Sequence, residues 1–154
     1  MTEGCAPLRD QDFPAPFCIM VTPRVEDIDG LNHVNNAVYV QWCEQVAWAH
    51  SEHLGLHLSD YQRLDRAMAI RRGEYDYLLP ALMGDQLVLS TWLTASDGKL
   101  TMVRNFQLQR EVTGQTLMRG RWDLVCIELS SGKARRMPPE FCDIYQAAVI
   151  HSTL

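Results

Sequence analysis

The sequence predicts an α+β protein in which an antiparallel β-sheet wraps around one long helix. A single long stretch in the first third of the chain has apolar residues at helical spacing, whereas nearly everything after it has the composition of β-strands. Glycine-containing turns separate these strands at the short distances typical of antiparallel hairpins. The chain has 154 residues, of which 47% are hydrophobic, which is the size and composition of one domain with its own core.

The first residues differ from the rest of the chain. Residues 1–16 contain three prolines and mixed charges. We therefore expect a flexible N-terminal arm at residues 1–16, followed by one domain at residues 17–154. The first strand is predicted at Phe17–Val25, where β-favouring residues dominate, and Pro23 marks an edge, a bulge or the end of that strand.

The strongest helix signal covers residues 38–54. The apolar side chains fall on one broad arc of the helical wheel and the polar side chains fall on the other. Asn35 or Asn36 is suited to the N-cap, and Gly55 is suited to the left-handed position just after the last turn. Trp48 falls on the polar arc, which indicates that a partner subunit or a ligand covers it.

After a linker, SDYQRLD at residues 59–65, the chain is predicted to form strands and a closing helix. The turns SDGK (residues 96–99) and SSGK (residues 130–133) indicate antiparallel hairpins. One sheet around one helix leaves the sheet edges uncovered, which predicts edge-to-edge self-association as a homodimer or homotetramer. The strands are expected at residues 67–78, 86–95, 100–110, 116–128 and 133–137, and the closing helix at residues 138–149.

Charge and cysteine usage exclude several classes of protein. The formal net charge of −5 disfavours a broad surface for nucleic acid or anionic membranes, because both need clustered cations. The five cysteines are scattered, without the spacing of a zinc knot or a disulfide framework. The N-terminus lacks the features of a signal peptide, and no apolar run approaches membrane-spanning length. We therefore expect a cytoplasmic protein without nucleic-acid or membrane partners.

Three separated segments resemble one family. The segment VEDIDGLNHVNNAVYVQWCEQVAWA (residues 25–49) resembles the signature of the 4-hydroxybenzoyl-CoA thioesterase-like family of hotdog-fold acyl-CoA thioesterases, with its Asp-x-Asp pair, polar loop and helix-opening Tyr. YDYLLPALMGDQLVLSTWL (residues 75–93) is similar to that family's second and third strands, and RGRWDLVCIELSSGKARRMPPEF (residues 119–141) to its last strands. The resemblance implies a hotdog fold, hydrolysis of an acyl-CoA thioester to a free acid and CoA, and no cofactor beyond the CoA of the substrate.

The same resemblance makes Asp29 the catalytic carboxylate, as a nucleophile or a general base, and the backbone N–H of Asn36 the donor to the carbonyl. The residue types agree with this chemistry, because thioester hydrolysis needs an attacking or water-activating group and oxyanion donors. A carboxylate just before a helix N-terminus supplies both. Asp27 and Asp29 are equally suited to turn and capping roles. His33 either orients the acid, contacts the substrate or ties down the loop.

Glu44, on the polar arc of the helix, is the alternative carboxylate, because a related branch of hotdog thioesterases places its catalytic acid there. Its other reading is a solvated or subunit-bridging glutamate. Tyr39 and Trp48 are candidates to bound the acyl pocket, while Trp42 is expected in the core.

CoA is a polyanion, so its binding site should carry cations. The candidates are Lys99, Arg104, Arg135 and Arg136, although exposed arginines are often simply solvated.

No metal site is expected, because Gly55 interrupts the only cluster of histidines. Two alternatives stay open for the function: hydrolysis of a thioester of acyl carrier protein, and acyl-CoA binding without turnover. In plant acyl-carrier-protein thioesterases an Asn follows two residues after the catalytic Asp, and Leu31 occupies that place here.

Overall fold

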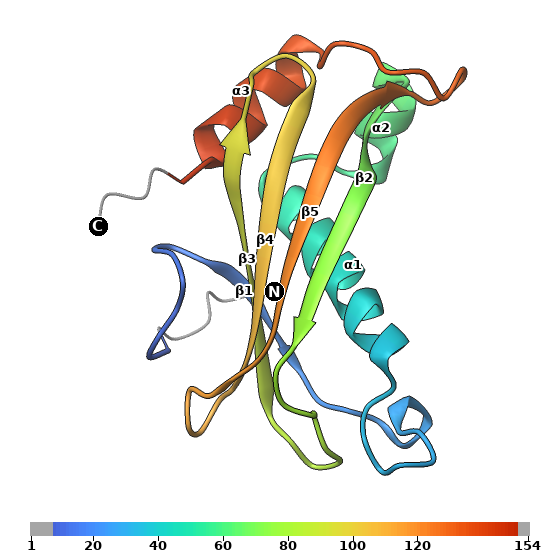
Figure 1. Cartoon of the computed structure of the whole chain (residues 1–154). Coiled ribbons are helices and arrows are strands. Elements are labelled where there is room, and N and C mark those ends of the chain that lie inside the picture. The colour runs from blue at the N-terminus through green and yellow to red at the C-terminus, as the bar shows by residue number, and fades with distance from the viewer. Residues whose placement is uncertain (1–7, 151–154) are drawn as a thin grey trace.

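The computed structural model describes residues 8–150, and it confirms the predicted α+β architecture. Five strands form one antiparallel sheet in the order β1-β3-β4-β5-β2, and the long helix α1 lies against one of its faces (Figure 1). The strands are β1 (Phe17–Val21), β2 (Arg66–Tyr77), β3 (Leu87–Ser96), β4 (Thr101–Arg110) and β5 (Thr116–Glu128).

The helices are α1 (Asn36–His53), α2 (Leu58–Leu64) and α3 (Pro139–Ala148), with a short 3-10 helix, η1, at Val25–Asp27. The expected linker at residues 59–65 was wrong, because most of it is helix α2. The N–H of His57 donates to the Asp60 carboxylate at 2.9 Å and starts the helix, and buried Tyr61 anchors it. Seven residues are too few to give a periodic sequence signal, so packing decides this helix.

Two predicted strands differ from the structure. The first ends at Val21 rather than Val25, since Pro23 cannot continue the ladder. The strand expected at residues 133–137 is reduced to a single bridge between Ile127 and Ala134. After that bridge, the N–H of Met137 donates to the carbonyl of Lys99 at 2.7 Å, so the chain turns toward the β3–β4 turn.

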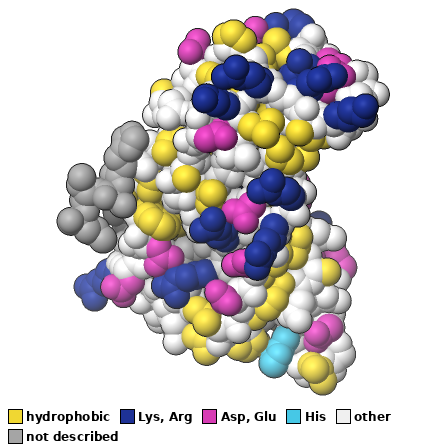
Figure 2. Space-filling model, turned by 45° about the horizontal axis from the view of Figure 1, so that its top comes forward, with side chains coloured by type: hydrophobic (Ala, Val, Ile, Leu, Met, Phe, Trp, Pro, Cys, Tyr) yellow, Lys and Arg dark blue, Asp and Glu magenta, His cyan; other side chains and the backbone are white. Residues whose placement is uncertain are grey.

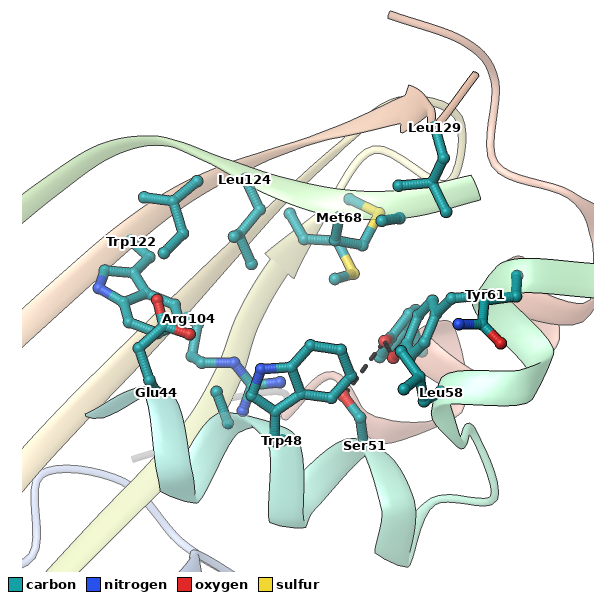
Figure 3. Close-up of a pocket in the computed structure, with 16 residues that line it drawn as sticks. Glu44, Trp48, Ser51, Leu58, Tyr61, Met68, Arg104, Trp122, Leu124 and Leu129 are labelled. Carbon is teal, nitrogen blue, oxygen red and sulfur yellow. Dashed lines mark hydrogen bonds between the residues drawn. The ribbon is translucent and has the colours of Figure 1, made fainter. Parts of the chain in front are cut away.

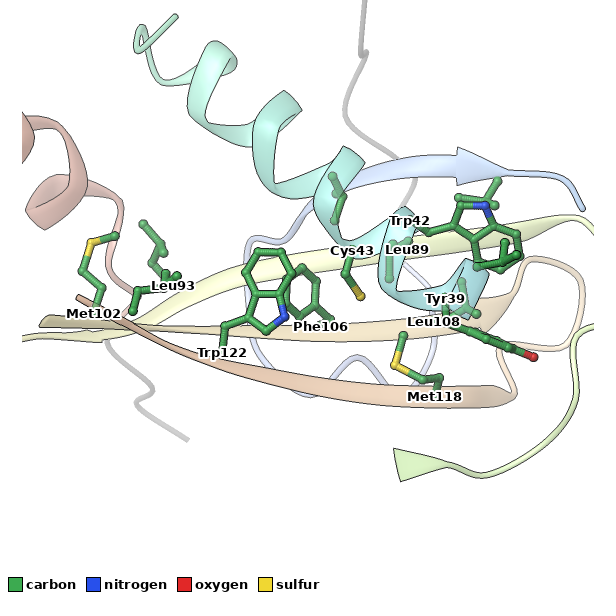
Figure 4. Close-up of a cluster of buried hydrophobic side chains, with 14 of the residues drawn as sticks. Tyr39, Trp42, Cys43, Leu89, Leu93, Met102, Phe106, Leu108, Met118 and Trp122 are labelled. Atoms are coloured by element: carbon green, nitrogen blue, oxygen red, sulfur yellow. The ribbon is translucent and has the colours of Figure 1, made fainter. Parts of the chain in front are cut away.

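The core lies between α1 and the sheet (Figure 4). Trp42 and Cys43 project from the helix, and Leu89 and Phe106 meet them from β3 and β4. Trp42 is 6% exposed, which confirms its expected place in the core. A fully buried Leu or Phe contributes about 1.5–3 kcal/mol, so this layer fixes α1 on the sheet.

The residues before β1 lie against the sheet where the described chain begins. Trp92 donates its indole N–H to the carbonyl of Pro14 at 2.9 Å, and Gln107 donates to the carbonyl of Asp10 at 2.9 Å. Asp12 forms an ion pair with Arg119 at 2.8 Å. Residues 1–7 of the expected arm lie outside the described residues. The division between arm and domain at residue 16 stays a prediction.

The two edges of the sheet are unequal. β1 offers five residues, whereas β2 offers twelve and pairs only with β5 within residues 8–150. A long unpaired edge is a template for pairing with another chain. Among the described residues, no helix is long and apolar enough to cross a membrane.

Candidate active site

Asp29 lies in the loop between η1 and α1, and its carboxylate organises that loop. Its Oδ1 accepts the backbone N–H of Leu31 at 2.9 Å and that of His33 at 3.4 Å. Its own N–H donates to the carbonyl of His33 at 2.8 Å. No described residue donates a hydrogen bond to the second carboxylate oxygen, Oδ2. Asp29 therefore holds the loop with one oxygen and keeps the other for a ligand or water.

Asp27 is built differently, although it lies only two residues earlier. It is buried, and its Oδ2 accepts the backbone N–H of Arg24 at 2.9 Å, with the Arg24 guanidinium at 3.8 Å. Its carbonyl accepts the N–H of Asn35 at 2.8 Å. The carboxylate contacts with Arg24 and the carbonyl contact with Asn35 both fix the conformation of the chain before α1. Asp27 is the last residue of η1, whereas Asp29 lies in the loop that follows it. The contacts of Asp27 therefore stabilise the local chain.

The first turn of α1 presents an unpaired donor. Asn35 is the N-cap: its Oδ1 accepts the N–H of Ala37 at 3.0 Å, and its carbonyl accepts that of Val38 at 2.9 Å. The N–H of Asn36 has no acceptor among residues 8–150. Unpaired amides at a helix N-terminus carry a partial positive charge and bind anionic oxygen.

Asp29, His33 and Asn36 line one hollow of about 280 Å³ at this end of the helix. Tyr39 and Tyr77 border it as well, and the Tyr77 hydroxyl donates to the carbonyl of Asn36 at 3.4 Å. The structure therefore brings the three predicted catalytic residues to one place. A carbonyl group in this hollow would have a carboxylate and a free N–H beside it.

Tyr39 fastens the start of α1 to the β2–β3 connection. Its hydroxyl accepts the backbone N–H of Ala81 at 2.9 Å. Burial raises the pKa of the Tyr39 hydroxyl, so it stays protonated at neutral pH. The side chain is thus a neutral, fixed part of the wall beside Asp29.

A larger cavity of about 440 Å³ lies between the second half of α1 and strands β2, β4 and β5 (Figure 3). Figure 3 shows Trp48 on α1 and, from the sheet, Met68 and Leu124 around it. Trp48 is 45% exposed and meets Tyr61 edge to face at 5.6 Å. Tyr39 and Trp48, predicted to bound one acyl pocket, therefore line two different cavities.

Glu44 stands at the larger cavity. It is exposed on α1 and is one of the lining residues. It lies eight residues after Asn36, which is about 12 Å along a helix axis at about 1.5 Å per residue. The two candidate carboxylates thus have different settings: Asp29 faces a helix N-terminus, and Glu44 faces an apolar cavity.

Arg104, one of the predicted ligands of CoA, does not lie at the surface where a cation at the mouth of the site was expected. The residue is only 3% exposed, and its Nη1 contacts His50 Nδ1 at 2.9 Å and Thr91 Oγ1 at 3.2 Å. The alternation of β4 explains its burial, because Met102, Arg104 and Phe106 share the face toward α1. This two-residue periodicity was the signal in the sequence that could have placed it.

Burial also sets the charges of this pair. It lowers the pKa of His50 to about 3, so the imidazole is neutral at pH 7. An arginine can only donate, so Nδ1 of His50 is the acceptor of their hydrogen bond. Burial lowers the pKa of Arg104 to about 10, which still leaves it cationic at neutral pH. Of the three histidines near the end of α1, His50 is buried, whereas His53 and His57 are exposed.

Three hydroxyl groups continue this polar cluster, and the sequence analysis missed them. The Tyr145 hydroxyl lies 2.6 Å from that of Tyr61 and 3.2 Å from that of Ser51. All three side chains are buried and line the larger cavity. They come from α1, α2 and α3, so no single segment of sequence carried this signal.

The other cationic candidates lie on the surface. Lys99, Arg135 and Arg136 are exposed, and Arg135 lies 3.5 Å from Glu128. They belong to the β3–β4 turn and the β5–α3 loop, at the opposite end of the molecule from the loop before α1 (Figure 1). Figure 2 shows Lys and Arg side chains over the upper end and also across the middle of this face. Their binding of CoA stays a prediction.

Comparison with known proteins agrees with this architecture. The family described as the thioesterase-like superfamily matches residues 23–144. A Staphylococcus aureus protein in complex with CoA superposes with a TM-score of 0.80 at 19% identity, over 94% of this chain and 92% of that chain. For a 1,4-dihydroxy-2-naphthoyl-CoA thioesterase from Synechocystis the TM-score is 0.75 at 21% identity, over 88% and 96%.

A third structure, the 12:0-ACP thioesterase from Umbellularia californica, gives a TM-score of 0.79 at 17% identity, over 89% of this chain and 51% of that chain. No significant match is found among curated proteins. At these identities the solved structures show the fold, which is the predicted hotdog arrangement of one sheet around a long helix.

Proposed function

Because the chain belongs to the thioesterase-like superfamily, we propose that it is an acyl-CoA thioesterase, which converts an acyl-CoA and water to a free carboxylic acid and CoA. The observation that carries the proposal is the hollow in which the carboxylate of Asp29 and the unpaired N–H of Asn36 lie together. The residues that line it need no cofactor for this reaction, and CoA takes part only as the leaving group of the substrate.

In this proposal the thioester carbonyl oxygen accepts the N–H of Asn36. The developing negative charge is stabilised by that donor and by the positive end of the α1 dipole. Asp29 then either takes a proton from an attacking water or attacks the carbonyl carbon itself. The C–S bond breaks and the CoA thiolate leaves, and in the second route water hydrolyses the resulting anhydride. His33 borders the same hollow and completes its wall.

Glu44 is the alternative carboxylate, and the larger cavity favours it. An apolar space of about 440 Å³ beside Glu44 suits an acyl group better than the smaller hollow does. What Glu44 lacks is a donor for the oxyanion, since it lies in the middle of α1, where backbone amides are paired. Mutation of both carboxylates separates the two possibilities.

We also propose that the protein acts as a homodimer. Strand β2 is twelve residues long and has one edge unpaired among the described residues, and exposed apolar side chains lie beside that edge. Ile70 is 42% exposed on this strand, and Trp48 and Leu58 are 45% and 58% exposed at the same cavity. Pairing of two β2 edges would complete the ladder and cover these side chains.

The decisive experiment is thiol release from a panel of acyl-CoA substrates, with acyl-carrier-protein thioesters of the same acyl groups in parallel. We expect Asp29→Asn to lower turnover at least a hundredfold, which is about 3 kcal/mol of barrier. Glu44→Gln is the matched control and should lose less than tenfold.

If Glu44→Gln lost turnover a hundredfold while Asp29→Asn stayed active, Glu44 would be the catalytic carboxylate. Faster hydrolysis of acyl-carrier-protein thioesters than of acyl-CoA would identify acyl carrier protein, and not CoA, as the carrier of the substrate. Binding of acyl-CoA without any thiol release would make the protein a non-catalytic binder.

A further inference from the structure

Arg104 is a buried cation without a counterion in the described chain. The guanidinium is 3% exposed at the larger cavity, and none of the ion pairs among residues 8–150 includes it. Its nearest polar neighbours are neutral: His50 is uncharged, and Thr91 and Tyr145 offer hydroxyl groups. A buried charge is costly unless an opposite charge or strong acceptors compensate it. The carboxylate of Glu44 lines the same cavity, but Glu44 is exposed and forms no ion pair with Arg104, so the guanidinium has no bound anion among the described residues.

Half of the guanidinium is still available for a ligand. Nη1 is occupied by His50 and Thr91, whereas Nε and Nη2 have no hydrogen-bond partner among the described residues. The side-chain atoms there that are both sealed from solvent and unpartnered are Arg66 Nε and Gln109 Oε1, and no atom of Arg104 is among them. Nε and Nη2 therefore keep access to the cavity. Together they form the fork that binds a carboxylate through two parallel hydrogen bonds.

The surroundings of this fork are suited to the end of a ligand. The hydroxyls of Ser51, Tyr61 and Tyr145 line the same cavity and form one hydrogen-bonded chain. The rest of the wall is mainly apolar, with Met68, Leu124 and other aliphatic side chains (Figure 3). A ligand in this cavity would be apolar along its length and negatively charged at its inner end.

We propose that the larger cavity binds the acyl group of a substrate that carries a second carboxylate at its far end, with that carboxylate on Nε and Nη2 of Arg104. The inference rests on the proposed function, because it names the acyl group of that reaction. A plain alkyl chain would place methyl groups against a desolvated guanidinium. A distal carboxylate would supply both the missing charge and two acceptors.

Arg104 belongs to β4, and the point of α1 that it contacts sets the length of such a substrate. It bonds to His50, which lies six residues after Glu44 and fourteen after Asn36, or about 9 Å and 21 Å along the axis at about 1.5 Å per residue. An extended chain advances by about 1.2 Å per bond, as the polypeptide backbone does. A carbonyl at Glu44 therefore fits an acyl chain of about eight carbons inside the larger cavity. A carbonyl at Asn36 would lie in the separate smaller hollow, so a chain of about eighteen carbons would have to cross from that hollow to reach Arg104.

The first arm of the test compares substrates on the wild-type protein. We expect kcat/KM for ω-carboxyacyl-CoA of eight or eighteen carbons to exceed that of the alkanoyl-CoA of equal length by at least about tenfold, the usual worth of a charged hydrogen bond. ω-Hydroxyacyl-CoA is the neutral control and should resemble the alkanoyl-CoA. Equal or higher efficiency with alkanoyl-CoA at both lengths, or with ω-hydroxyacyl-CoA, would overturn the proposal.

The second arm uses Arg104→Met, with Arg104→Lys as the matched variant that keeps the charge and loses the fork. Methionine fills the site without a buried charge, so we expect it to fold and to reverse the preference toward alkanoyl-CoA. Lysine should retain part of the preference. An unchanged preference in Arg104→Met contradicts the proposal. If Arg104→Met does not fold, the substrate comparison on the wild type still decides.

A binding measurement tests the carboxylate site in the larger cavity independently of thioester hydrolysis. Calorimetric titration of free octanedioate and octadecanedioate should show binding to the wild type and at least about tenfold weaker binding to Arg104→Met. If this holds while no thioester is cleaved, the proposed function fails and the carboxylate site stands. If thioesters are cleaved but neither dicarboxylate binds, the function stands and the carboxylate site falls.

Discussion

Replacement of Asn36 by proline removes one backbone N–H and very little else. The N–H of Asn36 has no acceptor among the described residues, so no hydrogen bond is lost within that part of the chain. The position is the first of α1, where the fixed φ of proline is tolerated. Asn35 has φ −58° and ψ 135°, which is the extended conformation that a residue before proline requires. We therefore expect the variant to fold.

The catalytic cost of the same change should be large. Loss of one oxyanion donor typically lowers kcat by about a hundredfold to a thousandfold, or about 2.7–4 kcal/mol. Asn36→Ala is the control, because it keeps the N–H, and its side chain is not the cap. The cap belongs to Asn35, whose Oδ1 accepts the N–H of Ala37. Asn36→Ala should therefore change both the rate and the Tm little.

The assay is thiol release by both variants, with the melting temperature of each. Asn35→Ala marks the effect of capping alone, and it should cost about 1 kcal/mol of stability. An Asn36→Pro variant as active as the wild type would show that the carbonyl is held elsewhere. Equal losses of rate in Asn36→Pro and Asn36→Ala would point to the side chain instead, and would refute the backbone donor.

Three further predictions concern stability and assembly. Asp27→Asn should lower the Tm, because the buried carboxylate loses its ion pair with Arg24, but it should reduce turnover less than tenfold; a larger loss of rate than in Asp29→Asn would show that the loop has been misread. The pKa of His50 is about 3 in the folded protein, below its ordinary value of 6.5, so the unfolded chain binds more protons between these values and stability should fall as the pH drops from 6.5 toward 3. His50→Gln keeps an acceptor for Arg104 and should flatten that dependence in pH-dependent melting, which an unchanged slope would contradict. Sedimentation should show a dimer, and a stable, fully active monomer would disprove the pairing of β2 edges.

Much of the fold followed from local sequence signals. The apolar arc of α1 and the long β-rich segments set the order of helix and strands, because both depend on periodicity within one segment. The turn SDGK formed a hairpin, with Gly98 at a φ of +70°, a conformation that glycine adopts without strain. Asp29, His33 and Asn36 were put forward by the resemblance of the loop before α1 to a thioesterase signature. They line one hollow in the structure, and their catalytic roles stay predictions.

What the sequence alone could not supply depends on contacts between distant segments. Helix α2 is too short to form on local propensity. The strand expected at residues 133–137 does not extend beyond one bridge, because the N–H of Met137 donates to the carbonyl of Lys99 and not to β5. The alternation of β4 could have marked Arg104 as inward-facing, although arginine is rarely buried in proteins. Only the packing of α1, α2 and α3 over the sheet creates the cavity that this residue lines. A cavity is the space left between elements, so its polar inner end appears only when those elements are placed together.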